Sequence, residues 1–276
     1  MSGEAPVEDV PQIVDDRPFL ARKLPLLKLS AFQLVEGIGS FIYVMTISLA
    51  EANVGNSSIN GTTHTRNMAP IAVGFILSVV VFSFGYVSGG HFNPAVTLGV
   101  LLIRGIRIEL ATAYWIAQCV GGLIGAAYAT IANGTTRHIP APQVYKNLPQ
   151  YVVTAFVAEA IFTGILVTVV LHCACSTQKN NHFYGLAIGM CVLAAGYAVG
   201  GVSGGSFNPA VAFSLQLVKC VAGNCIPLMH LWLYFAAPAA GAVGASVLFK
   251  MTHPEPKETE EEKQEKALVN SAQSLY

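Results

Sequence analysis

A nine-residue string that occurs twice constrains this chain more than any other feature. Residues 88–96 read SGGHFNPAV and residues 203–211 read SGGSFNPAV, so the copies stand 115 residues apart and differ at one position. In each copy the Asn is a good helix N-cap, and Pro suits the first helical position because its missing N–H would have no partner there. The string predicts two short helices, over residues 93–103 and 208–218, each preceded by a glycine loop with uncovered carbonyls.

Each of these helices is about half the length that a membrane-spanning helix needs, which is about 20 residues. Irregular backbone is tolerated at membrane depth only where it is buried in protein or lines a water-filled cavity. Two such elements at matching places in two halves of a chain are the pattern of broken helices that meet near the midplane of an inverted repeat. We therefore expect two re-entrant half-helices.

The rest of the chain predicts six transmembrane helices. Its 276 residues are 53% hydrophobic and 11% charged, with a mean hydropathy of +0.55, which is typical of a membrane protein. The apolar segments are long enough to span a bilayer and lie near residues 29–50, 69–87, 110–131, 150–173, 183–201 and 228–250. The predicted fold class is an all-α membrane protein, with six spans and two half-helices in an inverted repeat.

This pattern divides the chain into three parts. A cytoplasmic segment (1–28) precedes a channel-like domain (29–250), and a charged cytoplasmic tail (251–276) follows it. Within the domain, the first repeat covers about 29–131 and the second about 150–250, and three spans per repeat require the second repeat to cross in the opposite sense.

The distribution of Lys and Arg predicts the orientation. With both termini inside, the inner segments hold eleven of these residues and the outer loops hold four, Arg66, Arg137, Lys146 and Lys219, as the positive-inside rule requires. Three N-glycosylation sequons fall in the outer loops of this topology; they begin at Asn56, Asn60 and Asn133. The sequence does not distinguish the plasma membrane from an intracellular one.

Only two acidic residues fall inside the predicted spans, Glu36 and Glu159, in the opening helix of each half. A buried ionisable group in a membrane is a functional candidate by default. A scaffold role, in which each carboxylate accepts hydrogen bonds from a re-entrant loop, is favoured over a proton relay. A relay needs a series of titratable partners, and the counterpart of His91 in the second repeat is Ser206.

Other classes of function find little support. The formal net charge of +0 gives nucleic-acid binding no electrostatic basis. No set of nucleophile, base and orienting residue predicts an enzyme, and the six cysteines lack the spacing of a metal site. Cys220 and Cys225 flank a Gly-Asn turn on the predicted outer face, where a disulfide is allowed. Two free thiols are the alternative, which the sequence slightly favours.

These features together resemble the aquaporins, the major intrinsic protein family, over about residues 29–250. The resemblance rests on the six spans, the doubled Asn-Pro-Ala, the two glutamates and HFNPAVTLG at 91–99. It implies an hourglass pore in each protomer, a homotetramer, no cofactor, and passive flow of water or small neutral solutes. The pore motif would be Asn93, Pro94, Ala95, Asn208, Pro209 and Ala210. The pore carbonyls would be those of Gly89, Gly90, His91, Gly204, Gly205 and Ser206.

Two branches of the family share further likeness. GGHFNPAV and YWIAQCVGGLIGAA at 114–127 are most similar to the animal ammonia-permeable branch related to mammalian aquaporin eight. FNPAVAF at 207–213 is also similar to the plant tonoplast intrinsic proteins.

One departure from the family concerns its selectivity filter. The resemblance maps the four filter positions onto Val73, Gly196, Gly205 and Val211, and the Arg of most members is missing from the last. Such a filter is expected to be wide and apolar, and it favours ammonia, hydrogen peroxide, urea or glycerol over strict water selectivity. Tyr197 and Phe207 are the candidates to narrow it.

The sequence is also compatible with two other functions. One is a structural or junctional membrane protein with a closed pore. The other is an ion-conducting relative, which the missing Arg makes more plausible, although the facing half-helix dipoles oppose cations at the midplane.

Overall fold

The computed structural model describes residues 31–54, 68–134, 141–144, 148–176 and 182–253, and the regular secondary structure in these ranges is all helical. Six long helices are apolar enough to cross a membrane. They are α2 (Ala31–Val54), α3 (Ala69–Ser88), α5 (Ile108–Ala132), α6 (Pro149–Ala174), α7 (Tyr184–Ser203) and α9 (Leu233–Thr252). Two shorter helices, α4 (Pro94–Leu102) and α8 (Pro209–Val221), begin at the two Asn-Pro pairs, and a 3-10 turn η1 (Ile226–His230) precedes α9.

Several helix ends differ from the sequence prediction. Because α2 runs to Val54, Glu51 lies inside a span, and Glu109 lies in the first turn of α5. The expectation that only Glu36 and Glu159 lie in spans was therefore wrong. A span predicted from hydropathy ends where charged residues begin. Glu and Ala are nevertheless good helix formers, so the helices extend past these ends.

The second repeat differs from the prediction at two further places. Helix α8 continues to Val221, beyond the predicted end at 218. The predicted sixth span begins as η1, which has Pro227 near its start, and α9 itself begins at Leu233.

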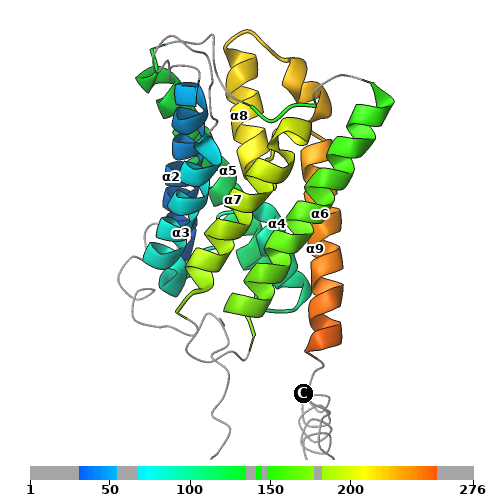
Figure 1. Cartoon of the computed structure of the whole chain (residues 1–276). Helices are drawn as coiled ribbons and strands as arrows, with labels where there is room; N and C mark the ends of the chain where they lie inside the picture. Colours follow the sequence, from blue (N-terminus) through cyan, green and yellow to red (C-terminus); the bar gives the residue numbers. More distant parts are fainter. Residues whose placement is uncertain (1–30, 55–67, 135–140, 145–147, 177–181, 254–276) are drawn as a thin grey trace, which may run out of the picture.

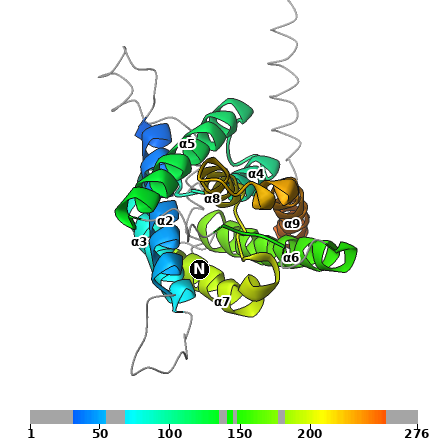
Figure 2. The same cartoon turned by 90° about the horizontal axis from the view of Figure 1, so that it is seen from above.

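The helices pair in a way that repeats between the two halves. Helix α2 packs against α5 and α3, and in the second half α6 packs against α9 and α7, while α3 and α7 join the halves. Figure 1 shows α4 in the lower part of the bundle and α8 in the upper part, and the view from above places α8 among the longer helices (Figure 2). Each half-helix packs against the last span of the other half, α4 against α9 and α8 against α5.

Glycines allow the closest helix contacts. A Cβ on Gly121 would lie 2.0 Å from the carbonyl oxygen of Gly37, and a Cβ on Gly189 would lie 2.2 Å from that of Gly74. These backbones touch, as the small-xxx-small spacings Gly121/Gly125 in α5 and Gly185/Gly189 in α7 predict. The same spacing at Gly196/Gly200 also predicts packing, and for Gly200 this prediction is wrong, because a Cβ there meets no atom within 4 Å. Gly200 instead borders a cavity.

Candidate functional site

The two asparagines of the doubled motif are the N-caps of the half-helices. Asn93 and Asn208 have extended backbones, and each Oδ1 accepts a hydrogen bond from the N–H two residues later, Ala95 or Ala210, at 2.9 Å. Oδ1 of Asn208 also accepts from the N–H of Val211 at 3.4 Å. Capping uses the oxygen of each side chain and leaves its amide N–H groups for other partners.

Those amides join the two halves of the molecule. The Asn93 amide donates to the carbonyl of Phe207 at 2.9 Å, and the Asn208 amide donates to the carbonyl of Phe92 at 2.9 Å. The N-termini of α4 and α8 are therefore held face to face. Each Nδ2 carries a second N–H, and both asparagines line a cavity at the centre of the bundle.

The residue before each Asn has an unusual backbone conformation. Phe92 has φ of 47° and Phe207 has φ of 49°, and bulky side chains rarely adopt positive φ. Such strain costs about 1–3 kcal/mol per residue and persists only where the surroundings impose it. It occurs at the same position of both repeats, where a buried glutamate accepts a hydrogen bond from the N–H of each phenylalanine and so holds the loop in this shape.

The buried glutamates hold these loops. Glu36 accepts hydrogen bonds from the N–H groups of His91 at 2.9 Å and Phe92 at 2.7 Å, and from Ser88 Oγ at 2.7 Å. Glu159 accepts the equivalent three bonds at 2.9, 2.7 and 2.7 Å, from Ser206, Phe207 and Ser203. Both side chains are fully buried, so each carboxylate replaces water around donors that have no other partner.

Sequence reasoning missed the polar residues behind this scaffold. Tyr114 and Tyr234 donate to the carbonyls of Ser88 and Ser203, one in each half. The first half has a further donor, Gln118, whose Nε2 lies 2.8 Å from Glu36 Oε2 and 3.0 Å from Thr97 Oγ1. Their signal was present in outline, because a buried Gln or Tyr in a membrane helix needs a partner.

Two cavities are lined by residues of the second re-entrant loop. The central cavity, of about 10 Å³, is about the size of one water probe. Asn93 and Asn208 lie in its wall together with apolar side chains such as Leu77, Leu166 and Ile188. The wider cavity, which we call the vestibule, measures about 490 Å³.

The cavities divide the sequence-predicted site residues between them. All four filter positions lie in the vestibule wall: Val73, Gly196, Gly205 and Val211. Of the predicted carbonyl residues, Gly90 and His91 line the central cavity, Gly204 and Gly205 line the vestibule, and Ser206 lines both. Gly89, the left-handed C-cap of α3, lines neither cavity.

The two aromatic candidates for narrowing the filter take different places. Tyr197 borders the vestibule but is half exposed. Phe207 is buried, lines the central cavity and has its ring 6.0 Å from that of Phe162. Phe207 is therefore not part of the vestibule wall.

Two charged residues also border the vestibule, Glu51 from α2 and Lys219 from α8. Val211, Leu215 and Lys219 follow one another at intervals of four residues, so they lie on one face of α8, and all three line the vestibule. Val211 stands at the filter position where the Arg is missing. The nearest cationic side chain on that face of α8 is Lys219, about two helical turns away. Glu51 was missed because the predicted span ended at residue 50.

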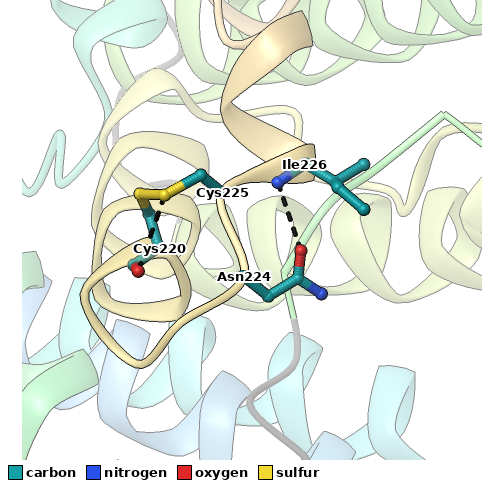
Figure 3. The surroundings of a disulfide bond; sticks show 4 residues. All are labelled: Cys220, Asn224, Cys225 and Ile226. Carbon is teal, nitrogen blue, oxygen red and sulfur yellow. Dashed lines mark hydrogen bonds between the residues drawn. A yellow bond between two sulfur atoms is a disulfide. The ribbon is translucent and has the colours of Figure 1, made fainter.

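A disulfide joins Cys220 to Cys225 where α8 meets η1 (Figure 3). The slight preference for free thiols was wrong. Gly223, at φ of 104°, turns the chain back, and its N–H donates to the Cys220 carbonyl at 2.9 Å. Asn224 Oδ1 then accepts from the N–H of Ile226 at 3.1 Å, the local bond that suits Asn to turns.

The remaining sequence candidates lie away from the cavities or outside the described residues. Asn133 caps the C-terminal end of α5, whereas Asn56 and Asn60 fall outside the described residues. His172 stands beside Cys173 and Cys175 in the sequence, a group that favours packing over a ligand role, and its ring packs against those of Phe249 and His253. No group of three metal-ligating side chains occurs within the described ranges.

The chain matches known proteins along most of its length. The profile of the family described as Major intrinsic protein matches residues 26–249 and, in a second match, residues 180–276. Aquaporin-8 of Notomys alexis is 33% identical over 222 residues, which are 79% of this chain and 80% of that protein. Aquaporin TIP1-1 of Arabidopsis thaliana is 32% identical, with 79% of this chain and 85% of that protein covered.

One further relative is named for glycerol uptake, and a solved structure shares the fold. The Glycerol uptake facilitator protein-like 6 of Lactiplantibacillus plantarum is 32% identical over 64% of this chain and 80% of its own length. Among solved structures, the aquaglyceroporin from Plasmodium falciparum superposes with a TM-score of 0.68 at 21% identity, covering 81% of this chain and 96% of that one. With its six apolar helices and its two facing half-helices, the chain is an integral membrane protein that belongs to the major intrinsic protein family.

Proposed function

We propose that the protein is a passive channel for water and small neutral solutes. The observation that carries this proposal is the pairing of Asn93 and Asn208, whose amides join the two half-helix N-termini at the wall of the central cavity. Membership of a family of channels supports it, and so do relatives named as aquaporins and as a glycerol uptake facilitator.

The proposed pore combines fixed donors with fixed acceptors. The second N–H of each asparagine amide donates to the solute, and loop carbonyls of Gly90, His91 and Gly204 accept from it. Each half-helix N-terminus carries about half a positive charge. Two of them face the centre, so a cation that enters loses hydration and meets repulsion. Glu36 and Glu159 act as supports for the loops, which their hydrogen bonds favour over a proton relay.

The selectivity we propose is broad. The four filter positions carry two valines and two glycines, and the vestibule they border is about 490 Å³ in volume. Solutes that tolerate an apolar entrance therefore fit best: ammonia, hydrogen peroxide, urea and glycerol, besides water.

We further propose the topology and assembly that the sequence predicts. Residues 1–28 and 251–276 are cytoplasmic and residues 29–250 form the channel domain, so the vestibule opens to the outside. Asn56, Asn60 and Asn133 are then available for glycosylation. The channel assembles as a homotetramer, as its family resemblance implies, in the plasma membrane or an intracellular membrane.

The two alternatives predict different behaviour in one cell-based experiment. Cells that express the protein are placed in hypotonic medium and in isotonic urea, and their swelling and clamped membrane current are recorded. Swelling without current is the expected result. A structural protein with a closed pore gives neither response, and an ion-conducting relative gives a current that reverses with the cation gradient.

A further inference from the structure

Three residues line both cavities and therefore mark the neck between them: Tyr43, Val192 and Ser206. They come from α2, from α7 and from the second re-entrant loop. A solute that passes from the vestibule of about 490 Å³ into the central cavity of about 10 Å³ has to cross this neck.

The polar groups at the neck are not equivalent. Val192 has no polar side-chain atom, and the hydroxyl of Ser206 already donates to the carbonyl of Asn208 at 2.8 Å. The Tyr43 side chain is 3% exposed, yet its hydroxyl makes no hydrogen bond to any part of the protein that the structure describes. It is the neck side chain with an uncommitted donor and acceptor.

The Tyr43 hydroxyl is also open to the cavities rather than sealed in the protein. Among the described residues, the fully enclosed side-chain oxygens without a partner belong to Ser40, Gln118, Thr163, Ser214 and Gln216. The Tyr43 oxygen is not one of them. A tyrosine hydroxyl that is buried usually finds a partner, and the partner within reach here is whatever occupies the neck.

The filter positions make such a group necessary. Val73, Gly196, Gly205 and Val211 supply no polar side-chain atom, so these four filter positions offer a solute only backbone groups. A polar solute that leaves water for an apolar neck pays for each hydrogen bond it does not recover. One hydroxyl at the neck recovers one of these hydrogen bonds.

We propose that Tyr43 is a selectivity-determining residue of this channel and that its hydroxyl binds the solute at the neck. This inference rests on the proposed channel function and deepens it: selection takes place at the neck and not at the wide filter ring. The solutes it favours are neutral molecules with both donors and acceptors, such as water and urea. Ammonia is less strongly hydrated and depends less on the hydroxyl.

The test is Tyr43→Phe, which removes the hydroxyl and keeps the ring. The purified variant is reconstituted in liposomes after size-exclusion chromatography, and the permeation of water, urea and ammonia is measured by stopped flow. We expect water and urea permeability to fall about fivefold, the rate equivalent of one ordinary hydrogen bond. Ammonia permeability is expected to fall less than about twofold.

Two further variants separate the hydroxyl from other effects. Tyr86→Phe makes the same chemical change on the exposed surface of α3, where the side chain is 71% exposed, and it is expected to leave all three permeabilities unchanged. Val192→Ala widens the neck but keeps the Tyr43 hydroxyl, so glycerol permeability is expected to rise and water permeability not to fall.

The outcomes distinguish this inference from the proposed function. Water and urea permeabilities of Tyr43→Phe equal to those of a conducting wild-type protein would overturn the inference alone. An equal loss for ammonia, water and urea would also overturn it, because a general closing of the pore would explain that result. Wild-type liposomes no faster than empty ones would overturn the proposed function, and the inference with it.

Discussion

Asn93 and Asn208 hold each other's loops: each side-chain amide donates to the carbonyl that precedes the other asparagine, at 2.9 Å in both directions. The two bonds link residues more than a hundred positions apart. They connect the two halves of the molecule at the point where the half-helices meet. Each asparagine also caps its own helix, so one side chain positions both the helix and its opposite loop.

The pair is expected to behave as one unit in a double-mutant cycle. Asn93→Ala and Asn208→Ala each remove a cap worth about 1 kcal/mol and a hydrogen bond worth about 1 kcal/mol, so each lowers stability by about 2 kcal/mol. Because both changes release the same loop contact, the double variant is expected to cost less than the sum, with a coupling of about 0.5–3 kcal/mol. Thermal unfolding in detergent measures it. Strict additivity would show that the two bonds act independently.

The two supporting glutamates are expected to differ in their sensitivity to mutation. Glu36 accepts an additional bond, from Gln118, that Glu159 lacks. In each Glu→Gln variant the new amide NH2 group faces groups that are themselves donors, and Glu36→Gln faces one donor more than Glu159→Gln. We therefore expect Glu36→Gln to destabilise the protein by about 1 kcal/mol more than Glu159→Gln does. Glu109→Gln, in the exposed first turn of α5, is the matched control and is expected to change little. Thermal unfolding of the three variants provides the comparison, and equal losses for Glu36 and Glu159 would contradict the expectation.

Restoring the missing filter charge is expected to narrow the range of solutes. Val211 lines the vestibule, so the guanidinium of Val211→Arg adds bulk and fixed donors there. We expect glycerol and urea permeability to fall more than water permeability. Val211→Met adds bulk without charge. Comparing it with Val211→Arg therefore separates the effect of a narrower filter from the effect of the added charge and donors. An unchanged ratio of solute to water in a well-folded Val211→Arg channel would count against Val211 lining the path.

The vestibule is expected to be open to thiol reagents once it contains a cysteine. Cys220 and Cys225 are joined in a disulfide, and the other described cysteines, at 119, 173, 175 and 191, do not line either cavity. Mercurials are therefore expected to inhibit the wild type weakly. Gly200 lies in the vestibule wall with room for a Cβ, so Gly200→Cys is expected to confer strong inhibition that a reducing thiol reverses. Osmotic shrinkage with and without the reagent measures it, and rapid full inhibition of the wild type would contradict this account.

The elements that the sequence predicts well are those whose signal is local and repeated. The doubled Asn-Pro marked the start of both half-helices, and long apolar runs marked the six spans, because lipid leaves a chain few other structures. Helix ends were less accurate. Glu51 was excluded from a span only because it is charged, although a helix continues through it.

What the sequence could not predict depends on which side chains meet. Repetition suggested equal halves, yet the positions of the second half that match Thr97 and Gln118 hold Ala212 and Pro238, which cannot form the same hydrogen bond. Gly200 had the spacing of a packing residue but borders a cavity. Tyr43 stands in an apolar run like any other aromatic residue, and only its position between the two cavities distinguishes it.

The most direct test of the account is a side-by-side stopped-flow comparison of water, glycerol, urea and ammonia in liposomes that contain the wild-type protein. We predict that water moves faster than in empty liposomes with a weak temperature dependence. We also predict that ammonia and at least one of the two larger solutes cross faster than in empty liposomes. Rates equal to those of empty liposomes for all four would contradict the proposed channel, and water permeation with complete exclusion of the other three would contradict a wide, apolar filter.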